Sequence, residues 1–235
     1  MNIDLHLSDT VDVVVDKKIE ITISPRWMFD GRKVILGPYH TADEHEKHVS
    51  QTTGSMEWLW SDTDEIRFAK TTLALQSMML NVPDASLAQT EILAIWQKAP
   101  INDGSLQLRQ AQDFQIEPTR WRWMDQNSEV LTCFLPRALD DAKQRLRLRL
   151  AQDIEILFAD TYYCGWSLHH TARYIVDAWE EPSGYDVDDK TTKLIYDYLS
   201  LVTDPYIEKM EDQDEVILQK LLDLSERTEV TVQPH

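Results

Sequence analysis

Residues 3–23 have the sequence IDLHLSDTVDVVVDKKIEITI, in which apolar and polar side chains alternate over three consecutive runs. Residues two apart share one face of a strand, so each run predicts a half-buried β-strand. Turn-forming residues at 8–10 and 16–18 separate the runs. The segment therefore predicts a three-stranded meander at the start of a β-rich body.

Paired tryptophans indicate two hairpins further along the chain. Trp58-Leu59-Trp60 precedes an acidic turn at 61–65 and an apolar segment at 66–68. Trp121-Arg122-Trp123 precedes a polar turn at 125–129 and an apolar segment at 130–134. We interpret both pairs as parts of an aromatic core wall built by cross-strand packing. The alternative is a duplicated unit with a period of 63 residues.

The segments between and after these hairpins have less decisive patterns. Residues 40–56 are polar, which predicts an exposed connection. The apolar spacing of 86–98 predicts a helix, ended by Pro100 and Gly104. Residues 137–160 fit both periods, and we expect a helix over 137–144 and one strand over 146–159.

After Gly165 the apolar spacing becomes helical. Ser167 is the expected cap of a first helix with Leu168, Ala172, Ile175, Val176 and Trp179 on one face. A second helix is expected over 189–202 and a third from Asp204-Pro205 onward.

These patterns predict an α+β fold with an antiparallel β-rich body and a helical, acidic C-terminal part. The expected boundaries are a β-rich body at about 1–165, a helical acidic segment at about 166–225 and a tail at 226–235. No linker rich in Gly, Ser or Pro divides the chain, so we expect residues 1–235 to form one domain.

The excess of acidic over basic residues limits the kinds of molecule that we expect this protein to bind. The 235 residues include 41 acidic and 23 basic side chains, for a net charge of −18. Nucleic acids and anionic membranes are bound by clustered Lys and Arg, so neither is an expected partner. A basic protein fits this charge better. We expect five arginines to form salt bridges with the surplus acidic residues. These arginines are Arg120, Arg122, Arg145, Arg147 and Arg149.

The location expected from the sequence is cytoplasmic. The first residues carry acids where a signal peptide needs Lys or Arg, and no apolar run approaches the roughly 18 residues of a membrane span. With only Cys133 and Cys164 present, we expect two reduced thiols rather than a disulfide framework.

Histidines and cysteines provide few candidates for chemistry. His45 and His48 have a spacing that places both rings on one side of a helix, but we interpret them as surface histidines rather than metal ligands. His169-His170 is expected at a helix start. Cys164 lies near these histidines in sequence, yet it also fits the end of an apolar strand. We therefore expect no metal, cofactor or catalytic residue.

Acidic residues are concentrated near the C-terminus. Residues 177–235 contain 16 acidic and 5 basic side chains, a net charge of −11. This pattern is typical of a solvated helix face, and it also suits an anionic surface with aromatic anchors that binds a basic protein. The candidate partner-binding residues are Trp179, Tyr185, Asp186, Asp188, Asp189, Glu208, Glu211, Asp212, Asp214 and Glu215.

The sequence thus favours a non-enzymatic binding or inhibitor protein, of the general kind to which immunity proteins and nucleic-acid-mimicking inhibitors belong. Two alternatives stay open. One is an enzyme or ligand-binding protein whose site residues converge only in the fold. The other is a structural subunit whose aromatic surfaces are buried between chains.

Overall fold

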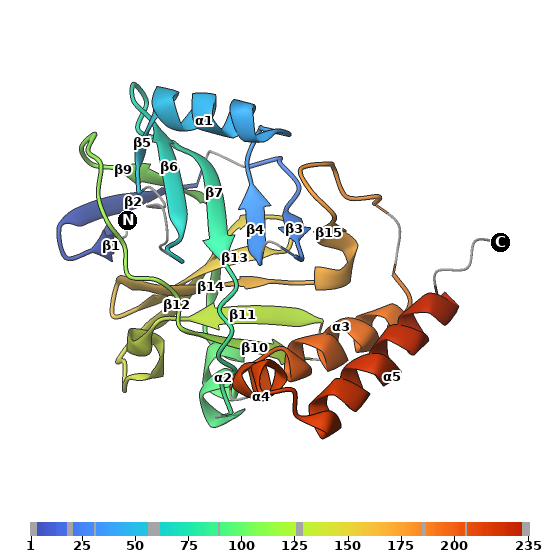
Figure 1. Cartoon of the computed structure of the whole chain (residues 1–235). Helices are drawn as coiled ribbons and strands as arrows, with labels where there is room; N and C mark the ends of the chain where they lie inside the picture. The colour runs from blue at the N-terminus through green and yellow to red at the C-terminus, as the bar shows by residue number, and fades with distance from the viewer. Residues whose placement is uncertain are drawn as a thin grey trace.

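Two packed β-sheets form the centre of the protein, and helices lie at their periphery (Figure 1). The computed structural model describes residues 4–17, 21–30, 32–55, 62–88, 90–125, 129–184, 187–204 and 206–231. The fold is α+β and dominated by sheet. Strands of the smaller sheet cross those of the larger sheet steeply, and the shared core lies between the two sheets.

The larger sheet has nine strands. Seven form a continuous path in the order β8 (Ile101–Asp103), β12 (Arg145–Ala151), β13 (Ile154–Ala159), β14 (Tyr162–Leu168), β1 (Asp4–Ser8), β2 (Val11–Asp16) and β9 (Ser105–Leu108). The other two are β10 (Trp121–Asp125) and β11 (Val130–Phe134), of which β11 also pairs with β14.

The smaller sheet has six strands. Their order is β15 (Ile175–Val176), β3 (Arg26–Met28), β4 (Lys33–Leu36), β7 (Leu75–Asn81), β6 (Glu65–Ala69) and β5 (Thr52–Gly54). The helices are α1 (Ala42–Gln51), α2 (Thr90–Gln97), α3 (Asp189–Leu201), α4 (Tyr206–Glu211) and α5 (Glu215–Thr231), with short 3-10 turns η1 (Pro136–Leu139) and η2 (Thr171–Tyr174).

The first two strands of the predicted meander are confirmed. β1 and β2 pair antiparallel and bury their alternating apolar residues. The third strand, expected around Ile19, Ile21 and Ile23, is not found in the described residues: 18–20 lie outside them, 21–25 form no strand, and the other neighbour of β2 is β9. β9 brings the fully buried Leu106 and Leu108 to this edge, whereas Ile21 and Ile23 are only partly buried.

The second tryptophan hairpin is confirmed as β10 and β11, but its expected faces are reversed. Arg122 and Met124 are buried, and Trp121 and Trp123 are half-buried. The face that carries Arg122 is covered by α3, whose carbonyl oxygens the guanidinium contacts. The core-wall interpretation therefore holds only in part, since Trp123 packs against the core from a half-buried position and Arg122 and Met124 occupy the buried face.

The first tryptophan pair, Trp58 and Trp60, lies outside the described residues. The apolar segment 66–68 belongs to β6, and the upstream strand that pairs with it is β5. Within the described residues, β6 therefore pairs antiparallel with β5 on one side and with β7 on the other.

Several connections differ from expectation. The exposed connection at 40–56 is replaced by α1 and β5. The helix at 137–144 is only the 3-10 turn η1, and the strand at 146–159 is the hairpin β12–β13. That hairpin turns at Asp153, which adopts φ 64°, a left-handed conformation that Asp tolerates. The helix expected within 86–98 is confirmed as α2.

The helix expected to begin at Ser167 is wrong, because this segment forms β14, η2 and β15. Gly165 explains the difference, since a Cβ there would lie 2.1 Å from the carbonyl oxygen of Cys133 on β11. Only glycine permits this close approach at φ 147°. β14 is consequently paired on both sides and buried on both faces, which removes the alternation typical of a half-buried strand.

The second predicted helix is confirmed as α3, with Asp188 as its N-cap. The third is two helices rather than one, because the chain turns at Gln213 (φ 56°) between α4 and α5. Pro205 lies outside the described residues. The helices α3, α4 and α5 form the helical layer, which thus begins at Asp189 rather than near residue 166.

Candidate functional site

Five of the predicted partner-binding acids lie together at one end of the helical layer. Glu208 and Glu211 are on α4, Asp212 and Asp214 are in the following turn, and Glu215 begins α5. Four are exposed, and Asp214 is half-buried. The Asp214 carboxylate accepts hydrogen bonds from the backbone N–H groups of Val216 (3.0 Å) and Ile217 (3.2 Å). One of the five therefore also caps a helix.

The remaining predicted residues do not join this group. Asp188 and Asp189 lie at the start of α3, whose 13 residues span about 20 Å. The pKa of Asp188 is lowered, mainly because its carboxylate accepts the backbone N–H of Thr191. Trp179 lies over the smaller sheet, with its ring 5.8 Å from that of His45. Tyr185 and Asp186 lie outside the described residues.

Exposed apolar side chains follow the acids directly. On α5, Val216 is 65% exposed, Leu218 37% and Leu222 58%. Only Ile95 and Ile101 are comparably exposed large apolar residues in the described part of the chain. Leu218 and Leu222 are one helical turn apart and share a face.

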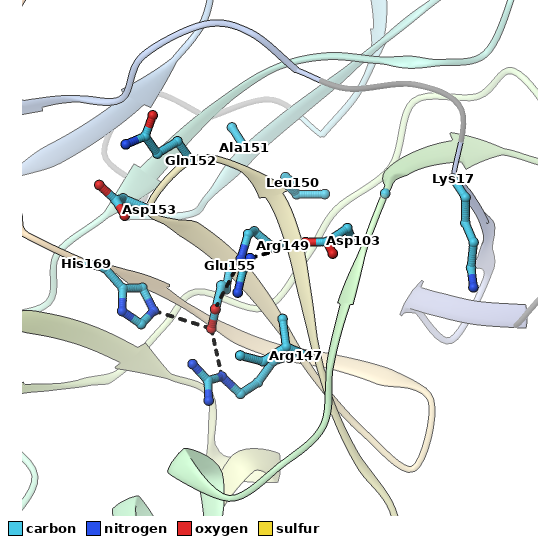
Figure 2. Close-up of a pocket in the computed structure, with 12 residues that line it drawn as sticks. Lys17, Asp103, Arg147, Arg149, Leu150, Ala151, Gln152, Asp153, Glu155 and His169 are labelled. Carbon is cyan, nitrogen blue, oxygen red and sulfur yellow. Dashed lines mark hydrogen bonds and ion pairs between the residues drawn. The ribbon is translucent and has the colours of Figure 1, made fainter.

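A second candidate site lies on the face of the larger sheet that carries α2. Strand register forms a row of side chains across five strands, from β12 to β10: Arg149, Glu155, Ser167, Thr132 and Trp123. The end of this row with Arg149 and Glu155 opens into a cavity of about 710 Å³ (Figure 2). The other end borders a cavity of about 330 Å³ beside α2.

Glu155 is the centre of the charged part of this row. Its side chain is 3% exposed, and its carboxylate lies 2.7 Å from Nε of Arg147, 3.4 Å from Nε2 of His169 and 3.9 Å from Nε of Arg149 (Figure 2). Burial raises the pKa of Glu155, but the contacts with His169 and Arg147 outweigh burial and lower it overall. A buried carboxylate with a lowered pKa thus lies against two arginines and a histidine that line the cavity.

The predicted arginine ion pairs are largely confirmed. Arg120, Arg122, Arg147 and Arg149 each contact an acidic side chain within 4.0 Å. Arg145 instead donates to the backbone carbonyl oxygens of Ala142 and Asp140. Glu155 and His169 were not predicted as site residues. His169 was expected at a helix start, but it follows β14.

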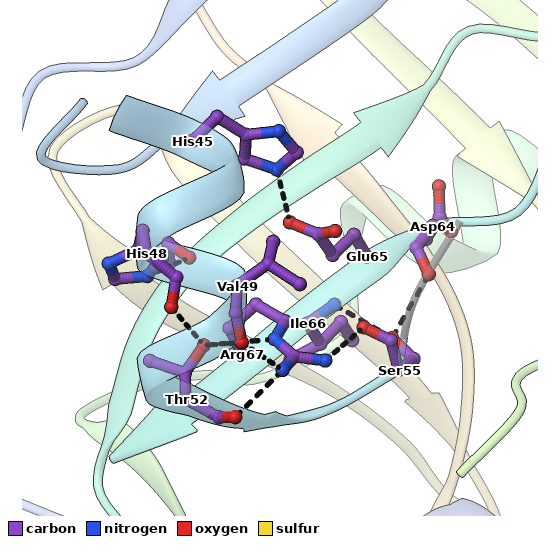
Figure 3. A network of polar contacts seen from close by, with 10 residues as sticks. His45, His48, Val49, Thr52, Ser55, Asp64, Glu65, Ile66 and Arg67 are labelled. Carbon is purple, nitrogen blue, oxygen red and sulfur yellow. Dashed lines mark hydrogen bonds and ion pairs between the residues drawn. The ribbon is translucent and has the colours of Figure 1, made fainter. Parts of the chain in front are cut away.

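A third polar cluster fixes α1 to the smaller sheet (Figure 3). Nε2 of His45 lies 2.8 Å from the buried Glu65, and Nε2 of His48 lies 2.8 Å from Oγ of the buried Ser77. Arg67 is 1% exposed and donates to the carbonyl oxygens of Val49, Thr52 and Ser55. The interpretation of both histidines as surface residues is therefore wrong, since they anchor a helix.

The cysteines are both free and buried. Burial raises the pKa of the Cys164 thiol, whereas an activated thiol nucleophile has a lowered pKa. In the described ranges, no group of three or more His, Cys, Asp and Glu side chains is arranged to hold a metal ion. Among helices in those ranges, none combines the length and apolar character needed to cross a membrane.

Comparison with known proteins gives no match to a family model, a curated protein or a solved structure.

Proposed function

We propose that this protein is a non-enzymatic binding protein that holds a basic protein partner on the acidic end of its helical layer. The acidic end comprises Glu208, Glu211, Asp212, Asp214 and Glu215, together with the exposed apolar residues Val216, Leu218 and Leu222 on α5. The observation that carries the proposal is the adjacency of carboxylates and exposed apolar side chains. Within the described part of the chain, no ion pair joins these five acids to a basic side chain.

The two kinds of side chain serve different steps of binding. Carboxylates without basic partners generate a negative potential that accelerates encounter with a cationic surface, most strongly at low salt. Leucine and valine side chains that lose water on contact slow dissociation. A basic partner with its own apolar patch complements both.

The test begins with identification of a partner. The full-length protein is immobilised, a lysate of the source cell is applied at low salt, and retained proteins are released by rising salt. We expect a basic protein to be released as salt rises. Retention of only further copies of this chain would contradict the proposal and favour the structural-subunit alternative.

The captured protein then supports a quantitative test of the acidic end. A five-site variant carries Gln at the Glu positions and Asn at the Asp positions, so position 214 keeps an acceptor for its cap. We expect association to slow at least about tenfold, with a flatter salt dependence. The matched control neutralises five exposed acids elsewhere: Asp43, Glu46, Glu91, Asp141 and Asp177. Equal effects of the two variants would assign the rate to net charge and contradict the proposed site.

A further inference from the structure

The large cavity beside Glu155 brings cations together in a protein whose net charge is −18. Its lining includes Arg147, Arg149, Lys17 and His169 (Figure 2). Three acids also line it, and each contacts a basic side chain: Asp103, Asp153 and Glu155. The lining is thus close to neutral, so it repels an anion less than the rest of this acidic molecule does.

The guanidinium groups of Arg147 and Arg149 differ in their exposure and in how many close hydrogen bonds they make within the protein. Arg147 is 14% exposed and donates to Glu155 at 2.7 Å and to the carbonyl oxygen of Gln97 at 3.1 Å. Arg149 is 45% exposed and has only longer ion pairs in the described part, at 3.4 Å to Asp103 and 3.9 Å to Glu155. Arg149 therefore keeps donors that face solvent and suit a bidentate oxyanion.

The adjoining smaller cavity has an apolar lining. It is bordered by Leu93, Trp96, Trp123, Phe134 and Leu157. Two hydroxyl groups also border it, those of Thr132 and Ser167, which lie 3.1 Å apart.

Arg147 and His169 line both cavities, so the apolar and the charged spaces are neighbours. Volumes of about 330 and 710 Å³ lie within the range of small-molecule sites, roughly 300 to 1,000 Å³.

We propose that these two cavities together bind a small amphipathic organic anion. Its aromatic or aliphatic body occupies the apolar cavity beside Trp123, and its carboxylate or similar oxyanion is held by Arg149. Arg147 is a positioning residue, because its contacts with Glu155 keep the shared wall in place. This site is separate from the acidic end and does not depend on the function proposed for that surface.

The test uses two fluorescent probes that differ by one charge. 1-Anilinonaphthalene-8-sulfonate carries an anion, and N-phenyl-1-naphthylamine has the same rings without it. In titrations of the full-length protein, we expect the anionic probe to bind one site about tenfold more tightly than the neutral probe, as a charge-assisted hydrogen bond predicts. Naphthalene-1-acetate, a carboxylate, should displace the anionic probe.

Variants then locate the bound probe. Arg149→Gln should reduce affinity for the anionic probe about tenfold and leave the neutral probe unchanged. Trp123→Ala should weaken binding of both. Arg120→Gln removes the same charge outside the cavities, from a side chain that is 58% exposed, and should change neither affinity.

Three results would overturn the proposal. These are equal affinities for the two probes, unchanged binding of the anionic probe in Arg149→Gln, and binding of neither probe to the wild-type protein. Because Arg149 is nearly half exposed, its replacement should leave the fold intact, which thermal unfolding of the variant checks. The five-site acidic-end variant should bind both probes normally, so this test and the test of partner binding fail independently.

Discussion

Arg122 links the larger sheet to the helical layer through one buried side chain. Its side chain is 3% exposed and donates to the carbonyl oxygens of Pro83 (2.9 Å), Leu199 (2.8 Å) and Val202. Leu199 and Val202 lie at the C-terminal end of α3, where carbonyl groups lack helical partners and carry partial negative charge. The guanidinium thus satisfies backbone groups that the contact with β10 buries.

Replacing this side chain should be strongly destabilising. Arg122→Met keeps most of the aliphatic volume but leaves buried carbonyl oxygens without donors, so we expect a loss of about 2 to 4 kcal/mol in the free energy of unfolding. Urea unfolding measures this difference. Arg120→Met, at an exposed position two residues earlier, should cost less than about 0.5 kcal/mol. Equal costs at the two positions would contradict the anchoring role.

The same residue shows the limit of a strand pattern. Alternation correctly predicts that Trp121 and Trp123 share a face, but it does not identify which face is buried. That choice is made by α3, which lies about 70 residues later in the chain. Glu155 was missed for a related reason. In one continuous strand it is remote from Arg149, whereas the turn at Asp153 makes the two residues direct neighbours.

Among the elements, α1 is the least apparent from hydrophobic periodicity. It has no buried residue, so no apolar stripe marks it. Its anchors are polar groups on β6 and β7: Glu65, Arg67 and Ser77. The local signal that would have found it is Thr41-Ala42-Asp43-Glu44, a capping-box sequence. The Thr41 hydroxyl indeed accepts the backbone N–H of Glu44.

His48 should make the stability of α1 depend on pH. Burial lowers the pKa of His48 in the folded protein from its usual 6.5, although the Glu65 charge opposes this. As the pH falls below about 6.5, the unfolded chain therefore binds the proton more readily, and the free energy of unfolding decreases. His48→Gln removes this linkage, so its free energy of unfolding should fall less between pH 7 and pH 5. If the free energy of unfolding depended on pH in the same way in the wild-type protein and in His48→Gln, the proposed linkage through His48 would be contradicted.

At the scale of the whole molecule, local patterns predict elements better than their pairing. β1, β2, the β10–β11 hairpin, α2 and α3 all arise from local periodicity or capping. In contrast, β1 pairs with β14, β12 with β8, and β15 with β3, each across a parallel contact between distant segments. The row that contains Arg149 and Glu155 depends on the turn at Asp153 and on the antiparallel pairing of β11 with β14, and hydrophobic periodicity predicts neither of these. The carboxylates of the acidic end belong to one continuous segment, so the sequence alone shows that they are neighbours, and their role in binding stays a prediction.

The helical layer and the sheets should unfold as one cooperative unit. Besides Arg122, the hydroxyl of Thr203 donates to the carbonyl oxygen of Asp84 at 2.7 Å, and the rings of Phe29 and Tyr198 lie 4.8 Å apart. Buried contacts between two parts of a chain couple their unfolding, because separation of either part exposes the surface and polar groups of the other.

The distribution of tryptophan makes this coupling measurable. All 8 tryptophans precede residue 180, so tryptophan fluorescence monitors the sheets and their flanking segments. Ellipticity at 222 nm is weighted toward helical residues, and most residues of the α-helices belong to α3 and α5. We expect both signals to give the same urea midpoint and slope, and limited proteolysis to release no folded fragment of residues 1–176. Arg122→Met should lower the two midpoints together. Loss of ellipticity at lower urea than the fluorescence change would instead show that the helices detach first, and the sheets would then be an independently stable body.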